Sequence, residues 1–137
     1  MRGNIMSREC INVFDEMYKA KNYTWSDLVK KGKVIAISGT VATDENHRTL
    51  FKGDLVAQTR HIYETVGKLL ERAGASFDDV IKTTDYITPQ AVKDYGKTGE
   101  IRREFFKDNY PAATGIVVHS LLAPNWLIEI EFLAVLD

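Results

Sequence analysis

The segment from Asp54 to Gly74 carries the clearest secondary-structure signal in the chain, and it limits what the rest can build. Core-type residues recur there at steps of three and four, at Leu55, Thr59, Ile62, Val66, Leu69, Leu70 and Ala73. This spacing is typical of one face of an α-helix. Asp54 is a suitable N-cap, and Gly74 a suitable residue to end the helix. The pattern predicts one long amphipathic helix, whose apolar face must be covered by other elements.

Most of the remaining apolar segments are short and rich in β-branched residues, which favours strands. We expect strands at 10–14, 33–38, 80–88, 114–122 and 127–136, a short hairpin arm, and a second helix at about 91–106. Residues 33–38 are apolar without a break, which predicts cover on both faces. Two helices with five or six strands predict an α+β fold, a single mixed sheet with both helices on one face. The opposite apolar face then needs cover, so we predict a closed homo-oligomer.

Composition narrows the function classes. A length of 137 residues predicts a single domain, 1–137. Eighteen basic and 19 acidic residues give a net charge of -1, which does not favour a nucleic-acid binder. The only cysteine, Cys10, excludes an internal disulfide and is expected in the core. No apolar run approaches the roughly 18 residues of a membrane span, and the start lacks the apolar core of a signal peptide, so we expect a cytoplasmic protein.

Glu129 and Glu131 alternate with apolar residues in the last expected strand. The period of two places both carboxylates on one face. Glutamates inside an apolar strand are costly unless that face meets a polar cleft, another subunit's cation or solvent. The residues alone leave open whether they form a site or an exposed face.

Two further side chains are candidates for chemistry, each with a structural alternative. Arg102 shares a helix face with apolar residues, so it either extends along the surface to solvent or points into a cleft to bind a carboxylate. His119, in the expected strand 114–122, is either a general base or a hydrogen-bonded structural histidine. The three histidines show no metal-ligand spacing, and there is no dinucleotide or phosphate-loop motif, so we expect no metal and no cofactor.

Four stretches taken in order resemble the RidA (YjgF) family of reactive-intermediate deaminases, from about residue 24 to the C-terminus. They are ISGT at 37–40, GASFDDVIKTT at 74–84, FF at 105–106 and IEIE at 128–131. Trp25-Ser26 and Pro111-Ala112 are further anchors. The resemblance implies a homotrimer of a chorismate-mutase-like fold with a barrel-like core and clefts between subunits. It also implies cofactor-free hydrolysis of enamines or imines to a keto acid and ammonia.

The resemblance assigns roles position by position. The family glutamate that positions water corresponds to Glu129, and the backbone carbonyl beside it to Gly115. The arginine that binds the substrate carboxylate corresponds to Ala113, so that cation is absent. One cleft tyrosine corresponds to Trp25 and another to Arg102. We therefore expect Arg102 to replace the missing cation and Trp25 to enlarge and flatten the pocket.

The resulting prediction is a hydrolytic deaminase of a larger or conjugated carboxylate, such as an aminomuconate-like compound, rather than of small 2-imino acids. Glu129 and Gly115 are the predicted catalytic residues. The predicted substrate-binding residues are Trp25, Arg102, Thr114 and His119. The alternative is a non-catalytic, ligand-binding trimer that uses the same cleft. RNA cleavage is disfavoured by the near-neutral charge.

Overall fold

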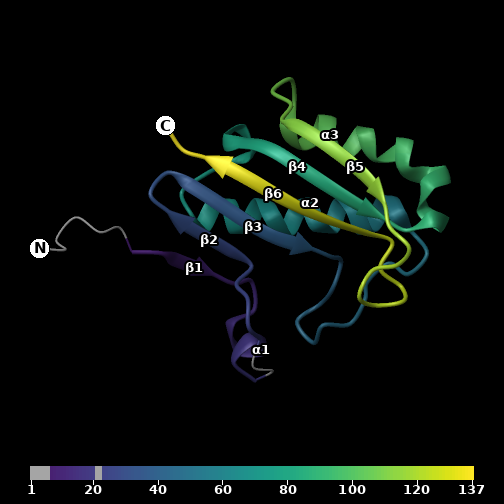
Figure 1. Cartoon of the computed structure of the whole chain (residues 1–137), viewed down its shortest axis with the longest axis horizontal. Coiled ribbons are helices and arrows are strands. Elements are labelled where there is room, and N and C mark those ends of the chain that lie inside the picture. Colours follow the sequence, from purple (N-terminus) through teal and green to yellow (C-terminus); the bar gives the residue numbers. More distant parts are fainter. Residues whose placement is uncertain (1–6, 21–22) are drawn as a thin grey trace, which may run out of the picture.

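The centre of the computed structural model is one six-stranded sheet with the strand order β1-β2-β3-β6-β4-β5 (Figure 1). The strands are β1 (Glu9–Ile11), β2 (Leu28–Lys31), β3 (Val34–Thr40), β4 (Val80–Ile87), β5 (Ala112–Val117) and β6 (Ile128–Val135). Neighbouring strands are antiparallel except β4 and β5, which are parallel. The single mixed sheet is confirmed. The structure describes residues 7–20 and 23–137, so residues 1–6 and 21–22 of the predicted domain lie outside the described residues.

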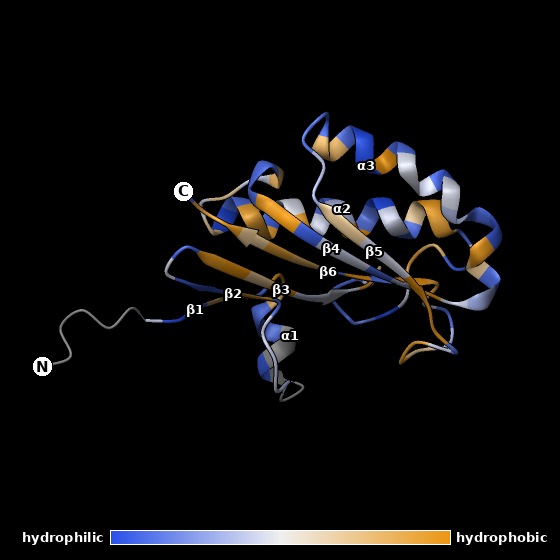
Figure 2. Ribbon diagram, turned by 45° about the horizontal axis from the view of Figure 1, so that its top comes forward, coloured by the Kyte–Doolittle hydropathy of each residue, from blue (hydrophilic) through white to orange (hydrophobic). Residues whose placement is uncertain are grey.

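The long helix is present as predicted. It is α2 (Leu55–Arg72), and the Asp54 carboxylate caps it by accepting a 3.0 Å hydrogen bond from the Ala57 N–H. Its buried side includes Ile62, Tyr63 and Val66 and packs on the sheet. Figure 2 shows the hydrophobic colour running along the strands beside this helix. Gly74 follows with φ 77°, a left-handed conformation that suits glycine.

The second predicted helix is present as two segments. The chain forms the 3₁₀ helix η2 (Pro89–Thr98) and only then the α-helix α3 (Gly99–Phe106). Gly96 and Gly99 lower α-helix propensity at this junction, which explains why one continuous α-helix was the wrong prediction. A short helix that was not predicted, α1 (Asp15–Ala20), lies apart from the other helices (Figure 1). No helix in the described ranges is long and apolar enough to cross a membrane.

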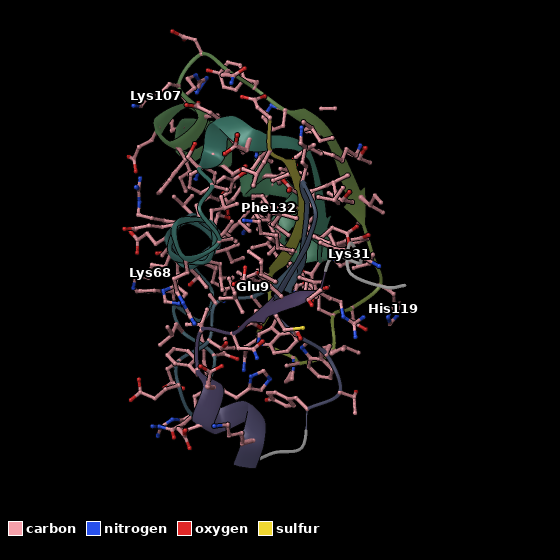
Figure 3. The ribbon with its side chains drawn as sticks, turned by 90° about the vertical axis from the view of Figure 1, so that its left-hand side faces the viewer. Glu9, Lys31, Lys68, Lys107, His119 and Phe132 are labelled. Atoms are coloured by element: carbon pink, nitrogen blue, oxygen red, sulfur yellow. The ribbon has the colours of Figure 1, made fainter. Side chains whose placement is uncertain are left out.

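The sheet has one covered and one uncovered side, and α2 lies on only one of them (Figure 3). We call the side packed against α2, η2 and α3 the helix face, and the other the open face. Ile35 and Ile37 of β3 are buried on the helix face, whereas Val34 on the open face is 48% exposed. Within the single chain, residues 33–38 are covered on the helix face only, and cover of their other face by a neighbouring copy stays a prediction. Cys10 is also exposed and not in the core, because β1 pairs it with Val29 on the open face.

Strand β5 ends earlier than predicted, and this moves His119 out of the sheet. The parallel ladder between β4 and β5 ends at the pair Ile87 and Val117, because Pro89 follows β4. The Val118 N–H still donates to the Ile87 carbonyl at 2.9 Å, and then the chain turns away. His119 thus lies in the connection 118–127, so its prediction as a strand residue was wrong.

One buried side chain holds this connection in place. The Gln58 amide of α2 donates to the Asn125 carbonyl at 3.0 Å and accepts from the Leu127 N–H at 3.0 Å. The same amide nitrogen also lies within hydrogen-bond distance of the Leu50 and Phe51 carbonyls, at 3.2 and 3.3 Å. Gln58 therefore joins the loop that precedes α2 to the loop that precedes β6.

Candidate functional site

Glu129 lies on the open face of β6, directly across from Tyr86 of β4. A Cβ atom on Gly39 of β3 would overlap the Glu129 carboxylate, so glycine at position 39 leaves the room that this side chain occupies. Burial raises the pKa of Glu129, and the negative charge of Glu131 raises it further. A partly buried carboxyl with a raised pKa is suited to act as a general base near neutral pH.

Glu131 lies on the same face, as the alternation predicted, but its surroundings differ. It is exposed and accepts a 2.7 Å hydrogen bond from the Tyr86 hydroxyl, which raises the pKa of Tyr86. Thr114 also lies on the open face, on β5, where its hydroxyl accepts from the Lys82 ammonium at 2.5 Å. Glu131 and Thr114 each have a partner within the chain, whereas Glu129 has no hydrogen-bond partner in the part of the chain that the structure describes.

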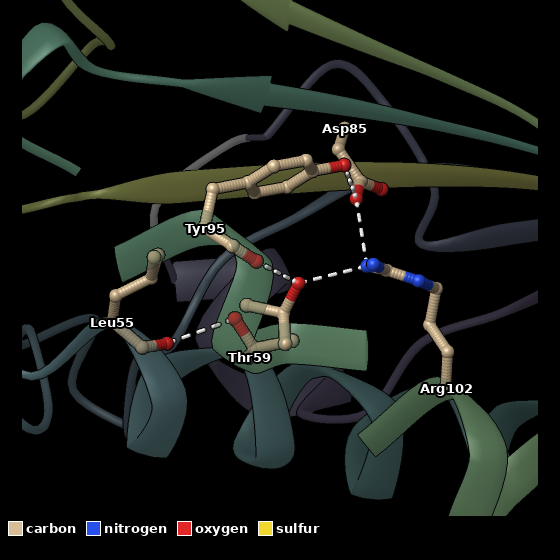
Figure 4. Close-up of polar contacts among 6 residues, drawn as sticks. Leu55, Thr59, Asp85, Tyr95 and Arg102 are labelled. Atoms are coloured by element: carbon tan, nitrogen blue, oxygen red, sulfur yellow. Dashed lines mark hydrogen bonds and ion pairs between the residues drawn. The ribbon is translucent and has the colours of Figure 1, made fainter. Parts of the chain in front are cut away.

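Arg102 lies on the helix face, within a polar cluster that Figure 4 shows. Its Nη1 donates to the Thr98 hydroxyl at 2.8 Å and lies 3.5 Å from the Asp85 Oδ2. Its guanidinium carbon lies 5.5 Å from the centre of the Tyr95 ring. The Tyr95 hydroxyl donates to the same Asp85 oxygen at 2.6 Å. Arg102 is therefore held by three side chains rather than extended into solvent.

Asp85 is almost fully enclosed in this cluster, with 3% of its surface exposed. Burial raises the pKa of Asp85, although the hydrogen bond from Tyr95 and the positive charge of Arg102 oppose that rise. Its Oδ1 has no hydrogen-bond partner among the described residues, and neither has the buried hydroxyl of Tyr63 on α2. Burial and the charge of Asp85 together raise the pKa of Tyr63.

Gly115 and Ala113 also lie on the helix face, because β5 pairs them with Asp85 and Thr83 of β4. Tyr95 covers Gly115, and a Cβ there would lie 2.9 Å from the Tyr95 hydroxyl. Glycine is thus required for this packing. All six residues of β5 are exposed in the single chain, so Gly115 lies under Tyr95 at an open sheet edge.

The predicted catalytic residues therefore do not meet within one chain. Glu129 and Thr114 lie on the open face, whereas Gly115 and Arg102 lie on the helix face. His119 lies in neither group, because it follows the end of β5.

Four rings near Gly39 contact one another in sequence, and we call them the aromatic row: Trp25, Tyr23, His47 and Trp126. Trp25 is 54% exposed and stacks on Tyr23 with ring centres 4.8 Å apart. Tyr23 meets His47 edge-on at 5.7 Å, and His47 meets Trp126 at the same distance. Trp25, Tyr23, His47 and Gly39 are among the residues that line a cavity of about 90 Å³. Gly39 thus borders both this cavity and Glu129.

Sequence reasoning missed three of these residues. Gly39 lies in the ISGT stretch and Tyr95 on the predicted helix face of Arg102, but neither was assigned a role, since the contacts that require them join different elements. Asp85 did give a signal, as an acidic residue inside the apolar strand 80–88. In residues 7–20 and 23–137, no group of three or more His, Cys, Asp or Glu side chains is arranged to hold a metal ion.

Comparison with known proteins places the chain in a family. The family model described as Endoribonuclease L-PSP matches residues 16–136. A RutC family protein of Pyrococcus horikoshii is 36% identical over 110 residues, which are 80% of this chain and 85% of that protein. A RutC family protein of Pyrococcus abyssi is 34% identical over 110 residues, or 80% and 84% of the two chains.

Solved structures of members of this family have a similar fold. The crystal structure of a YjgF/YER057c/UK114 family member from Mycobacterium tuberculosis has a TM-score of 0.77 at 28% identity, and the match covers 95% of this chain and 100% of that one. RidA from the Antarctic bacterium Psychrobacter sp. PAMC 21119 has a TM-score of 0.74 at 27% identity, over 83% and 89% of the two chains. The fold is that of this structural class, and the chain belongs to the RidA (YjgF, Endoribonuclease L-PSP) family.

Proposed function

We propose that this protein is a hydrolytic deaminase of a reactive enamine or imine, and that two copies of the chain within a homotrimer form each reaction pocket. The observation that carries the proposal is the state of Glu129. Its carboxyl is partly buried, its pKa is raised, and Gly39 leaves room beside it. A base of this kind holds and deprotonates a water molecule without a metal ion.

The requirement for two copies follows from the sheet. Glu129 lies on β6 and Gly115 on the edge strand β5, with β4 between them, and a strand carbonyl lies in the plane of the sheet. The Glu129 side chain and the Gly115 carbonyl of one chain therefore do not face the same substrate. The exposed edge strand β5 and exposed apolar residues such as Val34 and Ile116 offer a surface for a neighbouring copy. In this arrangement β5 of one copy faces Glu129 and Trp25 of the next.

The proposed reaction balances as a hydrolysis. The Glu129 carboxylate takes a proton from water while the water oxygen bonds to the imine carbon and the C=N π electrons move to nitrogen, and the protonated Glu129 passes this proton to that nitrogen. The Gly115 carbonyl helps to orient the water. The carboxylate of Glu129 then takes the proton of the added hydroxyl as the new carbonyl forms, and it passes that proton to nitrogen as the C–N bond breaks. The products are a keto compound and ammonia, and the protein supplies orientation and one mobile proton.

The aromatic row supports a flat, conjugated carboxylate substrate, such as an aminomuconate-like compound. The Trp25 ring is exposed and already stacked on Tyr23, so a planar substrate gains favourable ring contacts there. The cavity of about 90 Å³ in one chain is well below the roughly 300 Å³ of a small ligand pocket. A substrate of this size therefore also needs a wall from the neighbouring copy.

The test is ammonia release from a panel of short and long enamines that are generated in situ. We expect Glu129→Gln to lower kcat/KM at least about 100-fold, since it removes the base. Glu131→Gln is the matched control on the same strand and should stay within a few-fold of wild type at neutral pH. Full activity of the Glu129→Gln protein would refute the proposed role.

The second candidate is a ligand-binding trimer without catalysis. Ala113 favours it, because the resemblance implies a substrate-binding arginine at that position. For such a ligand-binding protein, the melting temperature should rise to a plateau as an enamine-derived metabolite is added, and no ammonia should be released. Ammonia release that depends on Glu129 contradicts this alternative.

A further inference from the structure

Arg102 lies on the same face of the sheet as Ala113 and Gly115. Asp85 pairs with Gly115 across the strands, and Arg102 lies 3.5 Å from Asp85. Ala113 is two residues before Gly115 on the same face. A cation from α3 thus approaches the edge where the resemblance implies a cation from β5.

We propose that Asp85, Tyr95 and Arg102 form a carboxylate-binding unit, in which Arg102 touches the ligand and Asp85 and Tyr95 are positioning residues. This inference rests on the proposed function and specifies how the anionic end of the substrate is bound. It assigns roles to two side chains, Asp85 and Tyr95, that the resemblance does not cover.

The contacts of Arg102 leave one edge of its guanidinium available. The hydrogen bond to Thr98 and the ion pair with Asp85 both go to Nη1, and neither uses Nε or Nη2. The side chain is 26% exposed, so solvent reaches it from outside. A carboxylate binds best to two parallel N–H groups along one such edge.

Asp85 orients Arg102 but contacts only one nitrogen of its guanidinium group. A bidentate pair would engage two guanidinium nitrogens, whereas here one nitrogen lies 3.5 Å from one oxygen. That oxygen also accepts the 2.6 Å hydrogen bond from Tyr95, whose ring packs on the guanidinium. The arrangement fixes the direction of Arg102 and restricts its rotamers before a ligand arrives, which lowers the entropic cost of binding.

Binding of an anion here is coupled to a proton. Ionised Asp85 and Arg102 together are neutral, so a ligand carboxylate adds an uncompensated negative charge at a largely buried place. Protonation of Asp85 removes that charge. The groups that face Asp85 are Tyr95 from η2, Arg102 from α3 and Tyr63 from α2, and the paired residues on the flanking strands, Gly115 and Ile130, do not titrate. Arg102 stays charged and both tyrosine pKa values are raised, so Asp85 takes up the proton.

The experiment is calorimetric binding of two unreactive probes, 2-oxobutyrate and trans,trans-muconate, to the whole protein near pH 6.5. Titrations in buffers of different ionisation enthalpy count the protons that are taken up. We expect Arg102→Ala to weaken binding at least tenfold, and Asp85→Asn to bind with no proton uptake. Arg103→Ala, a change of the adjacent exposed arginine, should bind as wild type does.

A second variant guards against misfolding, since Arg102→Ala leaves Asp85 buried without its cation. The double variant Asp85→Asn/Arg102→Ala carries no such charge, and adding Ala113→Arg to it should restore carboxylate binding.

Unchanged affinity in both Arg102 variants, or equal proton uptake in Asp85→Asn and wild type, overturns the inference. Turnover that depends on Glu129 would then leave the proposed function standing. Conversely, if binding depends on Arg102 but no ammonia is released, the carboxylate-binding unit stands and the proposed deaminase function is refuted.

Discussion

Glu129 and Asp85 lie on neighbouring strands of one sheet, and each has a pKa raised chiefly by burial. They differ in what surrounds them. Asp85 is enclosed and shares one oxygen between Tyr95 and Arg102. Glu129 lies over Gly39 on the open face and has no hydrogen-bond partner among the described residues. A buried carboxyl with partners positions other side chains, whereas one that is desolvated and unpartnered is available to a reactant.

The change with the largest expected effect on this contrast is Gly39→Ala. The new Cβ occupies the place of the Glu129 carboxylate, so kcat/KM for ammonia release should fall about 100-fold, since a displacement of about 1 Å costs that much. The melting temperature should change little, because the Glu129 side chain can move toward solvent. Gly96→Ala, which meets no atom within 4 Å, is the matched control. Wild-type activity in Gly39→Ala would show that the position of Glu129 does not matter.

On the helix face, Asp85→Ala should lower the free energy of unfolding by about 2 kcal/mol in a urea titration. It leaves Arg102 and the Tyr95 hydroxyl without their shared partner. The cost is below the roughly 3–5 kcal/mol of a broken buried ion pair, because Arg102 is partly exposed. Glu129→Ala should cost under about 0.5 kcal/mol, since it removes a desolvated carboxyl. Equal losses in the two variants would contradict the contrast between the carboxyls.

Gly115→Ala tests how closely Tyr95 is held over β5. Its Cβ would lie 2.9 Å from the Tyr95 hydroxyl, so we expect a loss of about 1–2 kcal/mol in the free energy of unfolding. Tyr95→Phe removes the hydroxyl and makes room. The double variant should therefore lose less than the sum of the two single losses. Strict additivity in this cycle would mean that the two groups do not meet.

The smallest expected effect concerns pH. Glu129 must be ionised to act as a base, so kcat/KM falls as the pH drops through its pKa. The charge of Glu131 contributes to the raised pKa of Glu129, so Glu131→Gln should lower it. The acid limb of the pH profile of kcat/KM should then move to lower pH, by less than about one unit since Glu131 is exposed. A shift to higher pH would have the wrong sign for this interaction.

Local patterns were sufficient for part of the architecture. The spacing of apolar residues located α2 and its cap, and strict alternation placed Glu129 and Glu131 on one face. The end of β5 was not accessible in this way, because it depends on where its partner β4 stops. The same holds for Arg102. Its helix was predicted, but which sheet face and which carboxylate it meets follow from the packing of η2 and α3 on β4. Cys10 was misplaced because a short edge strand buries only one side.

The hydrogen bonds of Gln58 limit how the two loops that carry His47 and Trp126 can move. Its single amide is bonded to backbone on both sides, in the loop before α2 and in the loop before β6. His47 stands on the first of these loops and Trp126 on the second. Neither loop can shift alone without breaking a buried bond, so the two loops behave as one coupled part. A molecule that separates His47 from Trp126 is therefore expected to displace both loops together.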